Sequence, residues 1–564
     1  MSSSVGRPTP VSNPRTQLTL ASIAVAFAAA DTYVVVLALP DMMAGVGLSA
    51  DQLQRAAPII SGFLLGYIAV LPLIGRIADV VGRTPVLVGA LLLFAVGSLI
   101  TAGAYDLPLV VTGRFLQGVG GGGLVPATLA LVADLWPAER RGLPLGVVGA
   151  VQELGSVLGP LLGAAVLAIA DWRYIFWLNL TVAVVLALLL RGWRPPPLSA
   201  IIGVLACIAL GLTLTAPERL ATGVTLGLPF VPFTGSSRLL TPIGVATLVL
   251  GLLWLGLVAW RSRGRMGTVL AQVDLVGAVL LALALAGVVL AFATADPERE
   301  LMSPAGPWLL VAAAVFAIAF AAWQRRTTRA IVPHGLLGAR PAWGSLVVSF
   351  LVGCALIAAL VDVPVFARTT QGGGQLAAAL VLLRFLIALP VGAVVGGWLT
   401  RRYGLGLITG AGLALSGAMF VLMAFWSRTA LDHWPATVVL LLCGFGFGLA
   451  LSPVNTAMLG ATPADSHGLV SALVVVARMV GMLVGVSALT AIGLRRYFAL
   501  ADDIPSPNEL CPKSPGNCRP FVDALRDAAV SQVHTIFAGA AISAFLAALL
   551  AALLLGRRGV VHTS

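Results

Sequence analysis

Three ionisable side chains lie inside long apolar stretches of this sequence. Asp31 follows LTLASIAVAFAAA, Glu153 lies within GVVGAVQELGSVLGP, and Arg478 lies within SALVVVARMVGMLVG. A charged side chain is costly at membrane depth unless it faces a bundle interior or a water-filled cavity, where it marks an ion or substrate pathway. A buried carboxyl group can take up a proton and release it when an arginine comes near. The three residues therefore predict proton coupling; an ion-pair set that only fixes packing is the alternative.

The composition places these residues in a membrane protein. Of 564 residues, 59% are hydrophobic and 10% are charged, and the mean hydropathy is +1.02. Soluble domains average about 25% charged residues. The formal net charge of +12 does not indicate a nucleic-acid partner, because the arginines cluster at the ends of apolar segments, which is the positive-inside pattern of membrane proteins.

Apolar segments recur along the chain at lengths near the 20 or so residues that span a bilayer core. They group as six, four and six, which predicts an all-α polytopic protein: two six-helix bundles joined by a linker with two to four extra transmembrane helices. Removing either middle hairpin preserves the charge pattern, so fourteen and sixteen spans both stay open. The segments lie near residues 18–39, 57–77, 85–104, 108–133, 142–168, 174–190, 198–216, 240–260, 273–294, 306–324, 343–367, 375–400, 406–426, 437–459, 468–494 and 530–556.

The arginines also orient the chain. With the N-terminal tail inside, most of them fall on cytoplasmic connections, so we expect a multi-pass protein of the plasma membrane with both termini in the cytoplasm. The predicted units are a cytoplasmic tail (1–17), an N-terminal six-helix bundle (18–193), an extra transmembrane hairpin (194–266), a linker hairpin (267–335) and a C-terminal six-helix bundle (336–564) with an extracytoplasmic loop at 495–529.

Several motifs resemble those of the major facilitator superfamily, over nearly the whole chain. GRIADVVGR at 75–83 is similar to its loop motif, although Thr84 and Pro85 stand where two basic residues usually follow. RFLQG at 114–118 is similar to its fourth-helix motif, and residues 155–163 are similar to the fifth-helix motif of its proton-driven exporters. The resemblance implies a gating or conformational role for Gly75, Asp79, Gly82, Arg83, Arg114, Gln117, Gly155, Gly159, Pro160 and Gly163.

A narrower resemblance is to drug:proton antiporters with extra linker helices, and within them to mycobacterial triacylglyceride-lipid exporters. It rests on DTYVVV at 31–36, QELGSVLGP at 152–160, VDLVGAVLLALALA at 273–286 and VVVARMVGMLVGVSAL at 474–489. It implies an antiporter driven by protons, without a cofactor, that exports a lipid such as triacylglyceride from the inner leaflet towards the cell envelope. It also favours Asp31 as the residue that titrates, and we expect a monomer.

The sequence also predicts positions or roles for several other residues. The small residues at 155–163 are expected at the sliding contact between the two halves. Arg114 and Gln117 serve either function or an interhelical hydrogen bond. Asp362 and Arg384 are expected to reach the membrane interface by snorkelling, and His467 is expected at the surface.

The polar segment after Leu494 contains Cys511 and Cys518, six residues of loop apart, on the oxidising side of the predicted topology. This spacing predicts a disulfide-closed loop. Residues 521–537 show helical spacing and continue without a breaker into the final span, so the last helix should project beyond the bilayer. The lipid exporters that the chain resembles have such projections and work with an exported lipoprotein, which is therefore the expected partner.

Alternative functions remain open. A multidrug efflux pump for lipophilic or cationic drugs would share the architecture, and acids exposed in the cavity would favour it. A membrane acyltransferase would need a catalytic Ser or His/Asp cluster, which the five histidines do not form, so we expect no enzyme. The sequence contains no metal-ligand spacing and no phosphate-binding loop of the G-x-x-x-x-G-K-S/T type. A receptor or scaffold would not require buried ionisable residues.

Overall fold

The computed structural model describes residues 13–48, 53–137, 140–191, 198–223, 225, 227–234, 238–261, 274–293, 303–327, 330–333, 335–371, 375–511 and 518–556. A few side chains within its helices, those of Glu153 and Pro160 among them, lie outside the described part. The described residues form helices and connecting turns, with no strand among them. The all-α prediction is therefore confirmed for this part of the chain.

The first six helices form one bundle. They are α1 (Pro14–Gly45), α2 (Leu53–Val81), α3 (Arg83–Ala102), α4 (Leu107–Leu135), α5 (Gly142–Leu167) and α6 (Arg173–Arg191). Asn13 accepts a hydrogen bond from the Arg15 amide and caps α1, and Asp106 caps α4 in the same way through Leu109. Side-chain acceptors at these positions satisfy amides that have no partner within the helix. Between α2 and α3, Gly82 adopts a φ of 100°, a conformation that favours glycine and makes the tight turn possible.

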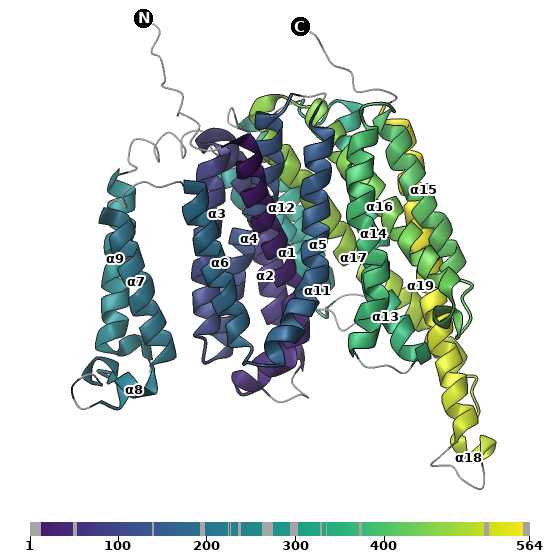
Figure 1. The fold of residues 1–564 in the computed structure, drawn as a ribbon, viewed down its shortest axis with the longest axis horizontal. Coiled ribbons are helices and arrows are strands. Elements are labelled where there is room, and N and C mark those ends of the chain that lie inside the picture. The colour runs from purple at the N-terminus through teal and green to yellow at the C-terminus, as the bar shows by residue number, and fades with distance from the viewer. Residues whose placement is uncertain are drawn as a thin grey trace, which may run out of the picture.

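The last six long helices form the second bundle. They are α13 (Arg340–Gln371), α14 (Gln375–Leu399), α15 (Leu405–Met423), α16 (Trp434–Gly460), α17 (His467–Ala501) and α19 (Arg519–Leu554). A short helix, α18 (Pro507–Leu510), lies between the last two. Both bundles stand side by side with their helices roughly parallel to one direction, and both chain termini lie at the same end (Figure 1). We call this the termini-bearing end and the opposite one the far end.

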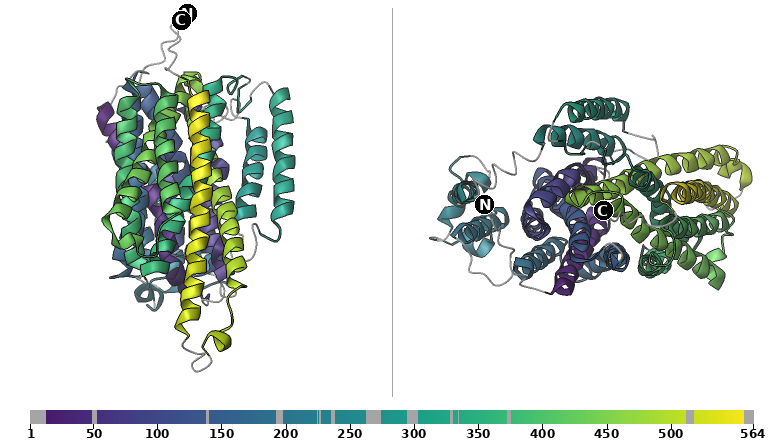
Figure 2. Two further views of the ribbon diagram at one scale, coloured as in Figure 1. Left: turned by 90° about the vertical axis from the view of Figure 1, so that its right-hand side faces the viewer. Right: turned by 90° about the horizontal axis from the view of Figure 1, so that it is seen from above.

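Two hairpins connect the bundles, as α7 (Leu198–Thr215) with α9 (Pro242–Arg261), and α11 (Leu275–Ala293) with α12 (Gly306–Arg326). The first hairpin stands beside the N-terminal bundle, where α7 touches α3. The second hairpin lies along one side of both bundles, where α11 packs against α2 and α17 (Figure 2). Fourteen of the described helices are long and apolar enough to cross a membrane. The long helices α1 and α5 pack against each other beside them.

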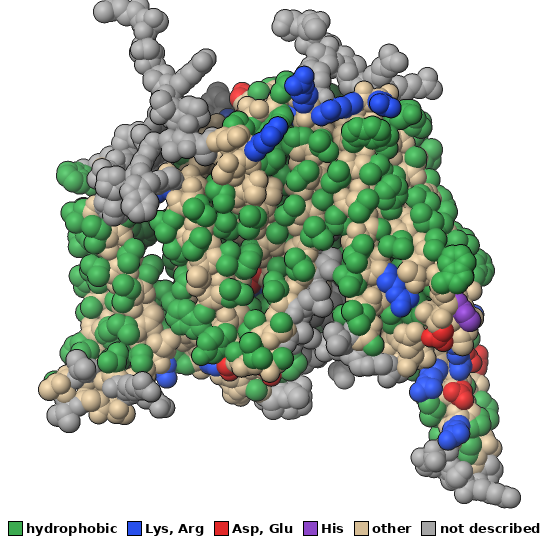
Figure 3. Space-filling view, in the orientation of Figure 1, with side chains coloured by type: hydrophobic (Ala, Val, Ile, Leu, Met, Phe, Trp, Pro, Cys, Tyr) green, Lys and Arg blue, Asp and Glu red, His purple; other side chains and the backbone are tan. Residues whose placement is uncertain are grey.

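The surface agrees with a membrane setting. Hydrophobic side chains cover most of the face shown in Figure 3, and most of the charged side chains on it lie towards its two ends and on the projection. The hairpin of α7 and α9 is an extreme case, since Leu248, Leu252 and Ile208 are each more than half exposed. Such surfaces are stable in lipid, where apolar side chains need no protein cover. The chain is a multi-pass membrane protein.

Helix α5 contacts different helices along its length. Near its start, a Cβ on Gly146 would lie 2.5 Å from the carbonyl oxygen of Ala393 on α14, and the Gly142 carbonyl accepts a hydrogen bond from Ser452 of α16. Further along, a Cβ on Gly155 or Gly159 would overlap the α1 backbone at Ala26 and Ala30 respectively.

The predicted place of these glycines at the contact between the halves is therefore wrong. Gly155 lies nine residues after Gly146, and at 100° per residue this is half a turn around the helix axis. The face of α5 that carries Gly155 and Gly159 is consequently directed at its own bundle. Gly163 is also buried in α5. It is Gly142 and Gly146 that let the two halves approach.

We expect Gly155→Ala to destabilise the protein by about 1–3 kcal/mol, because the added methyl group overpacks the contact of α5 with α1. Gly251→Ala is the matched control, since nothing lies within 4 Å of a Cβ placed there on α9 and alanine favours a helix. Thermal unfolding of the purified protein in detergent measures both. A melting temperature for Gly155→Ala equal to that of the control would contradict this account of the packing.

Candidate functional site

Asp31 forms a buried ion pair with Arg114. The carboxylate oxygen Oδ2 lies 2.5 Å from the guanidinium nitrogen Nη1 of Arg114, and both residues are 1% exposed. The other oxygen, Oδ1, accepts a hydrogen bond of 2.5 Å from the Asn179 amide on α6. The Arg114 guanidinium also lies 4.3 Å from the centre of the Phe63 ring, a cation–π contact that offsets part of the loss of hydration. Helices α1, α4 and α6 thus place one charged pair inside the N-terminal bundle.

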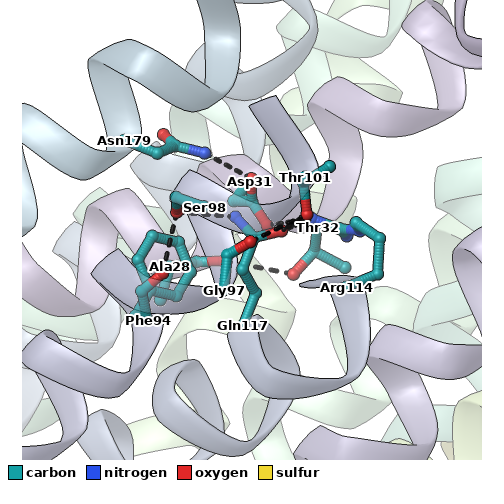
Figure 4. A network of polar contacts seen from close by, with 10 residues as sticks. All are labelled: Ala28, Asp31, Thr32, Phe94, Gly97, Ser98, Thr101, Arg114, Gln117 and Asn179. Atoms are coloured by element: carbon teal, nitrogen blue, oxygen red, sulfur yellow. Dashed lines mark hydrogen bonds and ion pairs between the residues drawn. The ribbon is translucent and has the colours of Figure 1, made fainter. Parts of the chain in front are cut away.

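A second layer of hydrogen bonds holds Arg114. The Gln117 side-chain oxygen accepts from Arg114 at 3.1 Å and from Thr101 at 3.3 Å, while its amide donates to Ser98 at 2.8 Å (Figure 4). Arg114 and Gln117 are one helical turn apart on α4, so both reach the same side of the helix. The interhelical role considered for Gln117 is present. Arg114 also contacts the candidate proton carrier directly.

The sequence grouped Asp31 with Glu153 and Arg478, and the structure groups the described residues differently. The cation at Asp31 is Arg114, whereas Arg478 on α17 lines a cavity between the two bundles. The side chain of Glu153 lies outside the described residues. The coupling roles of Asp31, Glu153 and Arg478 stay predictions.

The central cavity lies where α4, α5, α13, α16 and α17 meet. It has a volume of about 500 Å³, counting the space at its mouth. Most of its wall is aliphatic, and its polar lining residues are Gln152, Ser349, Asn455 and Arg478. A site between the halves near the membrane midplane is where secondary transporters bind substrate. Such a wall suits an apolar molecule with few hydrogen-bonding groups.

The two halves are in contact at the termini-bearing end, where a latch joins α2 to α17. Both oxygens of Asp79 accept hydrogen bonds from the first amides of α17, at 2.8 Å from Gly468 and 3.0 Å from Leu469. An anion is stabilised there because the amides at a helix N-terminus lack partners within the helix. A Cβ on Gly75 would lie 2.6 Å from the Gly468 carbonyl oxygen, so glycine allows the close approach.

Arg83 completes the latch from the N-terminal bundle. Its Nη1 lies 2.6 Å from Asp79 Oδ1, and its Nε lies 3.2 Å from Asp134 at the end of α4. Asp79 thus connects an arginine of its own bundle to a helix of the other. Thr84 and Pro85 do not prevent this arrangement.

The structure places three further residues differently, wholly or in part, from the sequence prediction. His467 was expected at the surface but is buried, and its Nε2 lies 3.1 Å from the Leu459 carbonyl oxygen. Asp362 was expected to snorkel but is also buried, because α13 and α19 pack along much of their length. Arg384 is half-buried and donates to the Thr437 hydroxyl at 3.0 Å.

The far end carries a projection made by α17, α18 and α19. Helix α19 has 36 residues, about 54 Å at 1.5 Å per residue, and it extends past the other helices with α18 at its tip (Figure 1). Cys511, directly after α18, and Cys518, directly before α19, form the predicted disulfide near this tip. Arg428, in the turn after α15, pairs with Asp527 and Asp523 of α19 and braces the projecting segment.

The sequence predictions did not include Asn179 and Asp274, two polar residues that form buried hydrogen bonds in the structure. Asn179 lies within the apolar helix α6 and contacts Asp31. Asp274 precedes α11 and accepts hydrogen bonds from the Gly277 amide, the Trp323 indole and the Gln324 amide. A search for uncharged amides within apolar segments would have found Asn179; the position of Asp274 before an apolar run is a helix-cap signal.

The sequence matches the model of the Major Facilitator Superfamily at residues 21–324 and 274–486. The chain belongs to the major facilitator superfamily. This transporter is 36% identical over 565 residues to a triacylglyceride transporter of Mycolicibacterium smegmatis, covering 97% of this chain and 88% of the relative. It is 37% identical to a probable triacylglyceride transporter of Mycobacterium leprae, covering 86% and 85%, and 36% identical to a triacylglyceride transporter of Mycobacterium tuberculosis, covering 86% and 83%.

Solved structures of the superfamily share the fold. The human organic anion transporter MFSD10 has a TM-score of 0.53 at 15% identity, over 96% of this chain and 100% of that one. The proton:xylose symporter XylE has a TM-score of 0.53 at 15% identity, over 97% of both chains. The two six-helix bundles and the resemblance to mycobacterial triacylglyceride transporters are confirmed. The relatives are transporters by name, in agreement with the prediction that this chain is not an enzyme.

We expect Arg114→Leu to lower the free energy of unfolding by about 3–5 kcal/mol, because it leaves the Asp31 carboxylate buried without its cation. The double variant Asp31→Leu/Arg114→Leu should regain most of this loss, since two apolar side chains then replace the pair. Thermal unfolding in detergent compares the single and double variants. A double variant as unstable as the single one would show that the ion pair does not account for the cost.

A second prediction concerns the latch between α2 and α17. Asp79→Ala removes the acceptor of two α17 amides and the partner of Arg83, so the termini-bearing end should open more often. A cysteine introduced at Val475, in the cavity wall, in a protein lacking its three free cysteines, should then react severalfold faster with a maleimide added on that side. The control is Asp465→Ala, in the turn before α17; an unchanged labelling rate for Asp79→Ala would contradict the latch.

Proposed function

We propose that this protein is a proton-coupled antiporter that exports a lipid such as triacylglyceride from the inner leaflet towards the cell envelope. The observation that carries the proposal is the 36% identity, over nearly the whole chain, to a relative named as a triacylglyceride transporter. The fold adds a cavity between two bundles, and the N-terminal bundle adds a buried carboxylate. Protons serve as the driving force, and no cofactor is required.

The coupling begins at Asp31. With the Arg114 guanidinium and the Asn179 amide as partners, the charged carboxylate is fully satisfied, and protonation would loosen its hold on α4. A proton that moves inward gains about 2.3 kcal/mol per 100 mV and about 1.4 kcal/mol per unit of pH difference. Loosening one helix contact by proton uptake is enough to bias the halves between two arrangements.

The lipid assignment draws support from the cavity. Its wall is largely Val, Leu and Ala, and the charged member among the described lining side chains is the cation Arg478. The few polar groups there, such as Asn455 and Ser349, suit the ester oxygens of a glyceride head.

The orientation follows from charge. Arginines lie at helix ends of the termini-bearing end, among them Arg325 and Arg326 at the end of α12 and Arg401 and Arg402 just after α14. Under the positive-inside rule this end is cytoplasmic. The plasma membrane is the proposed location, with the far end facing the envelope.

This orientation directs the projection of α17, α18 and α19 into the envelope space. We propose it as the contact for an extracytoplasmic lipoprotein that accepts the exported lipid. Its half-buried and exposed apolar residues, such as Leu510 and Val522, lie among charged ones, which is the mixed surface of a transient protein contact. Arg428 connects it to the turn after α15 through Asp523 and Asp527.

The test is reconstitution in lipid vesicles with labelled triacylglyceride or a labelled lipophilic cation, each with and without a proton gradient. We expect transfer of the triacylglyceride to rise at least severalfold with the gradient and the cation to show no such response. Asp31→Asn should abolish the gradient-dependent part while the protein stays folded. Its melting temperature should fall, because the asparagine retains a polar partner for Arg114 but removes its counter-charge.

Other results would overturn parts of the proposal. Gradient-driven movement of the cation in place of the lipid would assign a multidrug efflux pump. Lipid transfer that ignores the gradient would remove proton coupling. Full activity of Asp31→Asn would move the coupling site to another residue, with Glu153 next in line.

A further inference from the structure

Asn179 is the one described amide that touches the candidate proton carrier. Its Nδ2 donates to Asp31 Oδ1 at 2.5 Å, its side chain is buried at 5% exposure, and it reaches Asp31 from α6 across the bundle. In Figure 4 its amide points at the carboxylate from the side opposite Arg114. We propose that Asn179 is a positioning residue for proton coupling, which serves Asp31 in both its charged and its protonated state. This inference rests on the proposed proton coupling at Asp31.

The chemistry of the two partners differs. Arginine has N–H donors and no acceptor, so Arg114 can satisfy only a charged carboxylate or the carbonyl oxygen of a neutral one. An asparagine side chain carries both an N–H donor and a carbonyl acceptor. When Asp31 is charged, the amide nitrogen donates to Oδ1, as the structure has it.

Protonation reverses one hydrogen bond. One proton adds to Oδ1, the new O–H needs an acceptor, and a half-turn of the Asn179 amide about its last side-chain bond brings its own oxygen into place. Oδ2 stays available to Arg114, and the site gains one positive charge. A buried O–H without an acceptor would carry a desolvation cost, and the turned amide removes that cost.

The structure provides room for this turn. Asn179 also lines a small second cavity inside the N-terminal bundle, of about 200 Å³ when the open space around it is counted. Its other walls are apolar, from α1, α3, α4 and α6, with Phe27, Phe94 and Leu124 among them. No described polar group there competes for the amide, so the amide can rotate towards or away from Asp31.

The groups around Asp31 leave this task to Asn179. From α4 the charged neighbour is Arg114; α2 presents Phe63 to that arginine; and α3 presents Ser98 and Thr101 to Gln117. Helix α5 packs on α1 through Gly155 and Gly159, and the side chain of Glu153 on that helix lies outside the described residues. Among the described side chains, Asn179 is the contact of Asp31 that offers an acceptor.

The test compares Asn179→Leu, which has a similar shape and no polar atom, with Asn179→Gln, which keeps the amide and can extend into the adjoining cavity. Thr181→Leu is the control on the same helix, where the threonine is exposed and bonded only to the α6 backbone. The measurements are gradient-driven triacylglyceride transfer in vesicles and the titration of the Asp31 carboxyl band by infrared difference spectroscopy, with Asp31→Asn to identify the band.

We expect Asn179→Leu to lower the gradient-driven transfer at least tenfold. The titration midpoint of the Asp31 band should move by about half to one pH unit, because the lost hydrogen bond is worth more to the charged carboxylate than to the protonated one. Asn179→Gln should regain most of the transfer, and Thr181→Leu should match the wild type. A merely structural role would lower the melting temperature without moving the midpoint.

The outcomes separate the two proposals. If wild-type transfer ignores the gradient and no Asp31 band titrates, the proposed coupling fails and this inference with it. If the wild type responds to the gradient while Asn179→Leu keeps the wild-type midpoint and transfer, Asn179 has no part in coupling and the proposed function stands.

Discussion

The structure depends on holding opposite charges inside a protein that is itself surrounded by hydrocarbon. Charges in a low dielectric interact strongly, and losing one partner costs far more than losing both. Asp31 and Arg114 meet this condition inside the N-terminal bundle, and the surrounding glycines bring α1, α3, α4 and α5 close enough to exclude solvent. An ion pair so enclosed makes the bundle rigid while its charge is balanced. A change in protonation then disturbs the packing of several helices together.

The latch at the termini-bearing end also stabilises a charged side chain through polar partners, but it is less enclosed than the pair of Asp31 and Arg114. Asp79 exchanges hydration for two amides of α17 and one guanidinium, so the connection between the halves is polar and can be broken at modest cost. The contact of α5 with α14 beside it relies on small residues and close backbones. One polar and one apolar contact thus close the same end, and an opening motion must release both.

The helices could be placed from the sequence because a bilayer imposes a length on apolar segments, and each of the segments was found as a helix. The partners of the charged residues could not be identified from the sequence. Asp31 and Arg114 are 83 positions apart, and Asp31 and Asn179 are 148 apart. In a membrane helix both faces are apolar, so the hydrophobic pattern does not tell which side faces the bundle. That is why Gly155 and Gly159 were assigned to the wrong contact and why Arg114 was not recognised as the partner of Asp31.

The linker hairpin makes the two flanks of the transporter unequal. Asp274 ties the start of α11 to the end of α12 through Trp323 and Gln324, so the hairpin behaves as one body. Because α11 packs on α2 of one half and α17 of the other, any rocking of the halves must slide one of those helices along it. The flank under the hairpin is shielded from surrounding lipid, while the flank formed by α5 and α14 has no such cover from α11 or α12. A bilayer-embedded molecule therefore meets two different walls on the two sides of the protein.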